Sequence, residues 1–150
     1  MKLIRLKAKG VATFEEAEID FTKISYPLFA SGHTGAGKTT FFVDAITAAL
    51  YGKTYGEKTK EALKNFIMEG RSSCYVELEF EVNGKRYLIQ RRISKIGASE
   101  AYLKEWSEKA GQWSILSAQV SQVNNQVEKL IGFNYDDLMI FDRQTRVRVV

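Results

Sequence analysis

The stretch that decides the fold of this chain is Gly32-His33-Thr34-Gly35-Ala36-Gly37-Lys38-Thr39, which matches the phosphate-loop pattern GxxxxGK(S/T) at every fixed position. Its glycines allow positive φ, so that successive backbone N–H groups can point toward one anion. An apolar run, 27–31, precedes this loop, and residues 38–50 place apolar side chains at helical spacing after it. Strand, glycine loop and helix in this order are the context that the pattern requires. The sequence therefore predicts a loop that binds nucleotide phosphates.

Each residue type in the motif has a chemical role in holding a nucleoside triphosphate with magnesium. The helix that begins near Lys38 directs unpaired N–H groups and its positive dipole end toward the phosphates. Lys38 supplies a mobile positive charge for the β- and γ-phosphates, and the Thr39 hydroxyl is suited to complete a Mg²⁺ shell. His33 stands at a variable position of the pattern, where we expect an ordinary loop residue. The predicted nucleotide-binding residues are Gly32, His33, Thr34, Gly35, Ala36, Gly37, Lys38, Thr39 and Thr40.

Hydrophobic periodicity divides the rest of the chain into strands and a few helices. The clearest signal surrounds Asn83-Gly84, a dipeptide typical of type I′ turns, with alternating apolar residues on both sides. The predicted strands are 2–9, 18–21, 27–31, 74–82, 87–93, 102–106 and 113–116, and the predicted helices are 38–50, 120–131 and a short helix that Asn134 caps against Asp137. We therefore predict an α/β fold, a single P-loop NTPase domain over residues 1–150 with an antiparallel β-hairpin layer.

Composition excludes several classes of protein. The chain has 150 residues, of which 45% are apolar, enough for one self-sufficient core. Its only cysteine, Cys74, cannot form an internal disulfide, and with the distant His33 it makes neither a zinc cluster nor a Cys-His nucleophile pair. The longest apolar runs are about five residues, far below the roughly 20 of a membrane helix. The net charge of +4 permits a polyanionic partner without requiring one. We expect a cytoplasmic or nucleoid-associated protein without membrane contact.

Four segments together resemble a known family. They are the phosphate loop, the downstream Asp44-Ala45-Ile46-Thr47-Ala48-Ala49-Leu50-Tyr51-Gly52, the opening residues 1–7 with Glu18-Ile19-Asp20-Phe21, and the segment 130–137. Their order along nearly the whole chain resembles the N-terminal ATPase lobe of SbcC-type DNA-repair ATPases. These proteins are SMC-like relatives of the ABC ATPases and work with an Mre-type nuclease.

The resemblance implies that residues 1–150 are half of an ATPase head, with the coiled coil and the C-terminal lobe absent from this chain. It implies ATP and Mg²⁺ as cofactors and the missing lobe, the coiled coil, the Mre-type nuclease and DNA as partners. Two complete heads would dimerise with ATP, and hydrolysis would gate nuclease processing of DNA ends. We therefore expect ATPase activity only with the C-terminal lobe, and only weak ATP binding and negligible hydrolysis by the chain alone.

The family also has a glutamine loop, for which Gln144 in the run 141–145 is the candidate catalytic and magnesium-contacting residue. The usual Gln-Gly-acid run is absent, and the preceding spacing is about two residues short. One extra residue separates Thr40 from Asp44, and because one residue turns a helix by about 100°, no role is carried over to Asp44.

Two alternatives remain open from the sequence. The run 138–142 imitates a Walker B strand that ends in Asp142, which would suit a small stand-alone P-loop NTPase or kinase. Arg143, however, stands where the ABC branch carries its catalytic acid. The third possibility is a non-catalytic binding module whose partner contacts depend on nucleotide.

Basic residues gather in the first hairpin: Lys85, Arg86, Arg91, Arg92 and Lys95 lie within eleven residues without an intervening acid. They suit a DNA backbone contact or, because hairpin pairing sets Glu81 opposite Arg86, a solvated face with compensating charges. Arg91 shares parity with apolar Ile89 and Ile93, which predicts an inward stem or a buried partner. The aromatic residues of the second hairpin, Tyr102, Trp106 and Trp113, are expected to pack in the core or against another lobe rather than to stack on bases.

Overall fold

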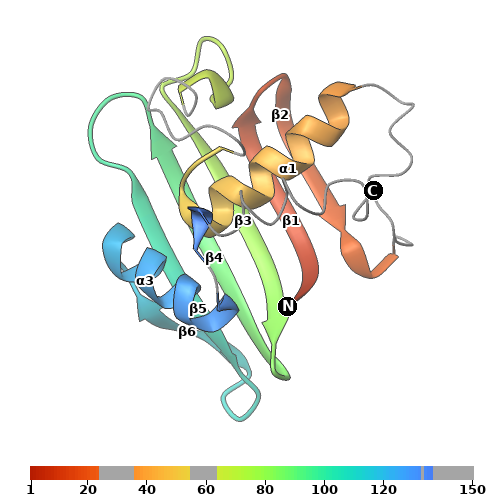
Figure 1. Cartoon of the computed structure of the whole chain (residues 1–150), viewed down its shortest axis with the longest axis vertical. Helices are drawn as coiled ribbons and strands as arrows, with labels where there is room; N and C mark the ends of the chain where they lie inside the picture. The colour runs from red at the N-terminus through yellow and green to blue at the C-terminus, as the bar shows by residue number, and fades with distance from the viewer. Residues whose placement is uncertain (24–35, 55–63, 133, 137–150) are drawn as a thin grey trace.

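The computed structural model describes residues 1–23, 36–54, 64–132 and 134–136, with the backbone alone for residues 36–41. Within these residues the centre of the molecule is a six-stranded sheet in the order β2-β1-β3-β4-β5-β6 (Figure 1). Every neighbouring pair of strands runs antiparallel. The strands are β1 (Lys2–Val11), β2 (Phe14–Asp20), β3 (Ser73–Val82), β4 (Lys85–Ser94), β5 (Glu100–Ser107) and β6 (Gln112–Ser117). The predicted antiparallel hairpin layer is therefore confirmed.

The hairpin of β3 and β4 forms the middle of the sheet. Asn83 and Gly84 have φ values of 52° and 79°, the left-handed conformation at both central positions of a type I′ turn. The turn sets Glu81 opposite Arg86 and Val76 opposite Arg91, as the alternation of the sequence predicts. The weaker second hairpin is also confirmed, because β5 pairs with β6 from Leu103 to Ser107.

Strand β2 differs from its prediction. Instead of 18–21 it covers Phe14–Asp20 and pairs with β1 along its length, while Phe21 begins the short 3₁₀ helix η1 (Phe21–Lys23). Its residues are mostly acidic, so hydrophobic alternation could not reveal the strand, which is held by backbone bonds to β1. The strand ends at Asp20, whose carboxylate accepts hydrogen bonds from the Thr22 backbone N–H (3.0 Å) and hydroxyl (2.5 Å).

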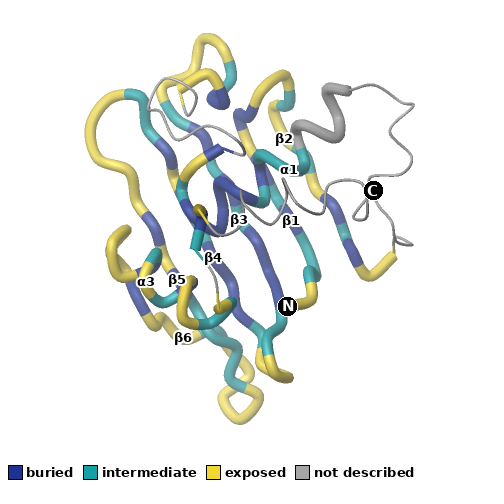
Figure 2. Tube along the Cα trace, viewed as in Figure 1, coloured by how far each residue is buried: buried dark blue, intermediate teal, exposed yellow. Residues whose placement is uncertain are grey.

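Two helices cover one face of the sheet (Figure 1). Helix α1 (Ala36–Tyr51) packs on β1, β3 and β4, and helix α3 (Val120–Ile131) packs on β5 and on α1. Figure 2 shows the buried stretches concentrated in the middle of the sheet and along α1. The side chains that form this core alternate along the strands and recur on the helices; the fully buried ones include Leu6, Val76, Leu78, Phe80, Ile89, Leu103, Val123 and Val127.

The helix ends follow the predicted signals. Helix α1 begins at Ala36, slightly earlier than predicted, and stops before Gly52, whose φ is 71° and whose N–H donates to the Ala48 carbonyl at 2.8 Å. Helix α3 has the predicted bounds and ends at Gly132, which is left-handed (φ 92°) and donates its N–H to the Glu128 carbonyl. Both ends rely on a glycine that adopts positive φ without steric cost.

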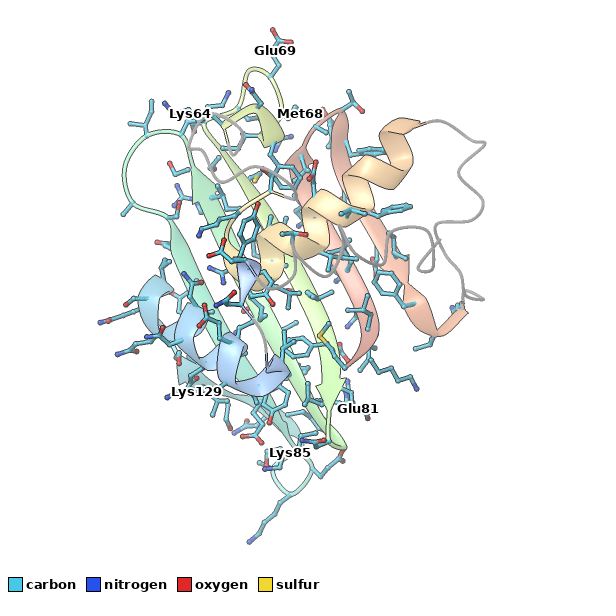
Figure 3. All side chains as sticks on the ribbon, in the orientation of Figure 1. Lys64, Met68, Glu69, Glu81, Lys85 and Lys129 are labelled. Carbon is cyan, nitrogen blue, oxygen red and sulfur yellow. The ribbon has the colours of Figure 1, made fainter. Side chains whose placement is uncertain are left out.

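A short segment after residue 63 extends the sheet beside β1. The Ala12 N–H donates to the Phe66 carbonyl and the Met68 N–H donates to the Gly10 carbonyl, both at 2.8 Å. An isolated bridge pairs Val11 with Ile67. In Figure 3, Met68 lies near the end of the sheet opposite the β3–β4 turn, where Glu81 and Lys85 are labelled.

Some predictions fall outside the described residues. They concern the strand 27–31, the loop residues Gly32–Gly35, the capping contact to Asp137, and the run 138–145 with Gln144 and Asp142. The phosphate-loop sheet therefore stays a prediction. No helix in the described part of the chain is both long enough and apolar enough to cross a membrane.

Candidate nucleotide-binding site

Helix α1 carries the described half of the phosphate-loop motif. It begins at Ala36, inside the motif, so the backbone of Gly37, Lys38 and Thr39 belongs to its first turn. No acidic residue lies in that turn. Because the first N–H groups of a helix have no partner within the helix and form its positive dipole end, this end of α1 fits a negatively charged group.

Small side chains bring α1 close to the sheet. Ala45, Ala48 and Ala49 are fully buried, and their small volume lets the helix backbone approach the apolar side chains of β1 and β3. Thr47 is also buried, and its hydroxyl donates to the Val43 carbonyl at 2.8 Å, so its polar group is satisfied within the helix. The stretch 44–52 of the sequence therefore forms the sheet-facing surface and the end of α1.

The C-terminal end of α1 is held by Arg91, which reaches it from β4. The Arg91 Nε donates to the Ala49 carbonyl at 2.6 Å, and an Nη group donates to the Leu50 carbonyl at 2.9 Å. The same Nη donates to Asn124 Oδ1 of helix α3 at 2.7 Å. Arg91 is only 3% exposed, and this burial lowers the pKa of its guanidinium to about 10. The predicted inward Arg91 with a buried partner is confirmed.

A second contact joins the chain just after α1 to the segment just after α3. The Tyr135 hydroxyl donates to the Thr54 carbonyl at 2.7 Å. The Tyr135 ring meets the Tyr51 ring edge to face, with centroids 6.2 Å apart, and Lys53 Nζ lies 5.1 Å from its centroid. Tyr135 is 4% exposed, so these contacts lie inside the molecule. They fasten the chain after α1 to the segment that leads toward Gln144.

The sequence contained no signal for two of these supporting residues. Asn124 is one of several polar residues on α3, and nothing in its spacing distinguishes it from its neighbours. Tyr135 stands in the short run after Gly132, where a tyrosine has no pattern of its own. Only the packing of α3 beside α1 reveals that both residues serve the end of α1.

The basic residues of the first hairpin are not a free cationic patch. Arg86 donates twice to Glu79 Oε2, at 2.7 and 3.2 Å, while Lys85 lies 3.5 Å from Glu105 and Arg92 3.9 Å from Glu100. Arg91 turns to the opposite face of the sheet, where it holds α1. These pairings favour the compensated, solvated face over a DNA contact among the alternatives that the sequence left open.

The aromatic residues of the second hairpin lie on the sheet face opposite the helices, because Leu103 and Ala101 of the same strand face the core. Trp106 and Trp113 are half-buried and meet at a ring-centroid distance of 5.3 Å, and the Arg86 guanidinium lies 5.3 Å from the Trp106 ring. Tyr102 is 37% exposed. The expectation that they belong to the core is therefore wrong, since strand alternation turns them outward.

Comparisons with known proteins agree with the motif. The family described as "AAA domain" matches residues 5–147, a range that includes the whole phosphate-loop motif. Three similar relatives are the SbcC subunits of the nuclease SbcCD from Staphylococcus aureus strains MRSA252, JH9 and Newman. Each is 33% identical over 144 residues, which cover 91% of this chain and 14% of the relative.

This chain thus spans about a seventh of the length of the curated relatives it matches, since the matched part is 14% of each. The resemblance to the N-terminal region of SbcC-type proteins is confirmed by these relatives. Because the family match covers nearly all of the chain, from β1 to beyond α3, the chain belongs to the AAA domain family.

Proposed function

We propose that this chain is the ATP- and Mg²⁺-binding N-terminal half of an SbcC-type ATPase head. Membership of the AAA domain family implies nucleotide binding. The identity of the nucleotide, the metal and the residues that hold them are the further content of the proposal. The observation that carries it is the start of α1 within the phosphate-loop motif, with an acid-free first turn.

The residues of this chain would divide the work as their chemistry suggests. Backbone N–H groups from Gly35 to Thr40 would hold the phosphates, because the first turn of a helix offers unpaired donors. Lys38 would neutralise charge on the β- and γ-phosphates, and Thr39 would complete the coordination of magnesium together with Gln144. The magnesium would supply further neutralisation of phosphate charge.

The role of the whole protein extends this proposal. The relatives are named as one of the two subunits of a nuclease, and this chain matches 14% of their length. We therefore propose that a C-terminal lobe and a coiled coil complete the head, that its partner is the nuclease subunit itself, and that ATP-dependent pairing of two heads gates the processing of DNA ends. Hydrolysis would need the C-terminal lobe, so the isolated chain would bind ATP weakly and turn it over negligibly.

Calorimetric titration of the 150-residue chain with ATP, with and without Mg²⁺, tests the nucleotide site. We expect binding that depends on Mg²⁺ and a Kd that rises at least about tenfold in Lys38→Ala, because a hydrogen bond to a charged group contributes about 1.5–3 kcal/mol. Lys129→Ala is the matched control, since Lys129 lies in the last turn of α3. Its Kd should stay that of the unchanged chain.

Two outcomes would contradict this proposal. If the unchanged chain and Lys38→Ala bind ATP equally or not at all, the motif does not form the site. Rapid Mg²⁺-dependent hydrolysis by the pure chain would contradict the half-head and favour the stand-alone NTPase instead.

A further inference from the structure

The buried charge of Arg91 has an unusual set of partners. Its three hydrogen bonds go to neutral oxygen atoms, those of Ala49, Leu50 and Asn124, although a buried cation is costly unless it is compensated. The last carbonyl groups of a helix lack donors within the helix and form the negative end of its dipole. The C-terminal end of α1 therefore supplies the compensation for Arg91.

The backbone after α1 leaves room for this guanidinium. A Cβ atom at Gly52 would lie 3.2 Å from the Arg91 Nη atom, tighter than an ordinary contact, and the φ of Gly52 is +71°. Gly52 thus both ends α1 and opens the space that Arg91 occupies. Two separate features of the chain, a glycine and an arginine far apart in sequence, fit the same contact.

This contact locates α1 as a rigid body. It joins three elements, because the arginine comes from β4, two acceptors come from α1 and the third comes from α3. A forked guanidinium with acceptors at 2.6 to 2.9 Å restricts both the rotation and the translation of the helix end. Helix α1 has 16 residues, a rod of about 24 Å, so its first turn shifts when its last turn shifts.

We propose that Arg91 is a positioning residue for the nucleotide site. By holding the C-terminal end of α1 against β4 and α3, it determines where the first turn of α1 stands relative to the sheet. Asn124 shares this task from α3. The inference rests on the proposed function, because it assigns to α1 a ligand at its N-terminal end. A displaced helix would offer the same N–H groups at the wrong place, and so would bind more weakly.

The test compares neighbouring arginines that face opposite sides of β4. Arg91→Lys keeps the charge but loses the fork, whereas Arg92→Lys changes a residue whose side chain is 51% exposed on the other face. The Kd for ATP with Mg²⁺ is measured by calorimetry at a temperature where circular dichroism shows each variant folded. We expect Arg91→Lys to raise the Kd at least about fivefold, a typical coupling between distant sites. Arg92→Lys should stay within about twofold.

Variants at Asn124 separate positioning from stability and remain available if Arg91→Lys does not fold. Asn124→Ala removes one acceptor of the guanidinium and should raise the Kd, whereas Asn124→Asp keeps an acceptor and should restore the lower value. Amide hydrogen exchange in residues 36–40 should quicken in Asn124→Ala but not in Arg92→Lys. A role confined to stability would leave the Kd of a folded variant unchanged.

The possible failures are distinguishable. An unchanged Kd in folded Arg91→Lys, or in Asn124→Ala, overturns the positioning role and leaves the nucleotide site standing. If the unchanged chain binds no better than Lys38→Ala, the proposed function fails, and the positioning role fails with it.

Discussion

The Arg91 guanidinium on β4 donates to Asn124 Oδ1 on α3 at 2.7 Å, directly beyond the C-terminal end of α1. The two residues lie 33 positions apart in sequence. Their contact ties the first hairpin to the last described helix and closes the end of α1 between them. The motif-bearing helix is thereby held at the end that lies farthest from the motif.

Replacing Arg91 with leucine should destabilise the fold strongly. The change leaves the Ala49 and Leu50 carbonyls without their donor in a buried site, and we expect a loss of about 3 kcal/mol in the free energy of unfolding. Urea unfolding followed by circular dichroism measures it. Arg92→Leu, on the exposed face, should change the same quantity by no more than about 0.5 kcal/mol. Equal losses in the two variants would contradict the role of Arg91.

Glu79 should matter more than its position on the outer face suggests. It is 3% exposed, and its two carboxylate oxygens accept from Arg5 at 3.1 Å and from Arg86 at 2.7 Å. Glu79→Gln removes the charge from both pairs, and because each arginine is partly exposed we expect a loss of only about 1–2 kcal/mol.

Glu81→Gln is the control for Glu79, measured by the same urea unfolding. Glu81 stands opposite Arg86 in the register, but the Arg86 hydrogen bonds run diagonally to Glu79. Glu81→Gln should therefore cost less than Glu79→Gln. The reverse order would show that direct register pairing, rather than the diagonal contact, stabilises this face.

The Cys74 thiol should make stability fall in alkaline solution. Burial raises its pKa from 9.0 to about 12, so the unfolded chain loses the thiol proton before the folded protein does. Above about pH 9 the folded state binds more protons than the unfolded state, and stability decreases as the pH rises. Chemical unfolding at a series of pH values should show a smaller decrease in Cys74→Ala.

The same burial predicts slow chemical modification. At about pH 9, a thiol reagent should react slowly with Cys74 in the folded protein and quickly in denaturant, because the thiolate is the reactive form. Equal rates in the two conditions would contradict the buried position.

The Tyr135 hydroxyl should contribute to holding the chain after α1. Tyr135→Phe keeps the ring against Tyr51 but removes the donor to the Thr54 carbonyl, and we expect a loss of about 1 kcal/mol. Tyr102→Phe removes a hydroxyl from a residue that is 37% exposed and should be nearly neutral. Thermal unfolding of both variants decides between them.

The amino-acid sequence by itself determined the elements whose signals are local. Asn83-Gly84 defines the central hairpin because its two residues accept positive φ, and Gly132 ends α3 for the same reason. The phosphate-loop motif named the candidate site because its residue types and spacing carry the chemistry. These features need only a few neighbouring residues, so periodicity and turn chemistry suffice to find them.

Only the tertiary structure decided what supports that site. Arg91 meets Ala49 across 42 positions and Tyr135 meets Thr54 across 81, and no local pattern encodes contacts at such separations. Strand parity predicted that Arg91 points inward, but the helix end that receives it depends on how α1 crosses the sheet. The charges of β3 and β4 were likewise visible in sequence, whereas the burial of Glu79 was not. Burial and partnership arise when distant segments pack together, and that is a property of the folded chain as a whole.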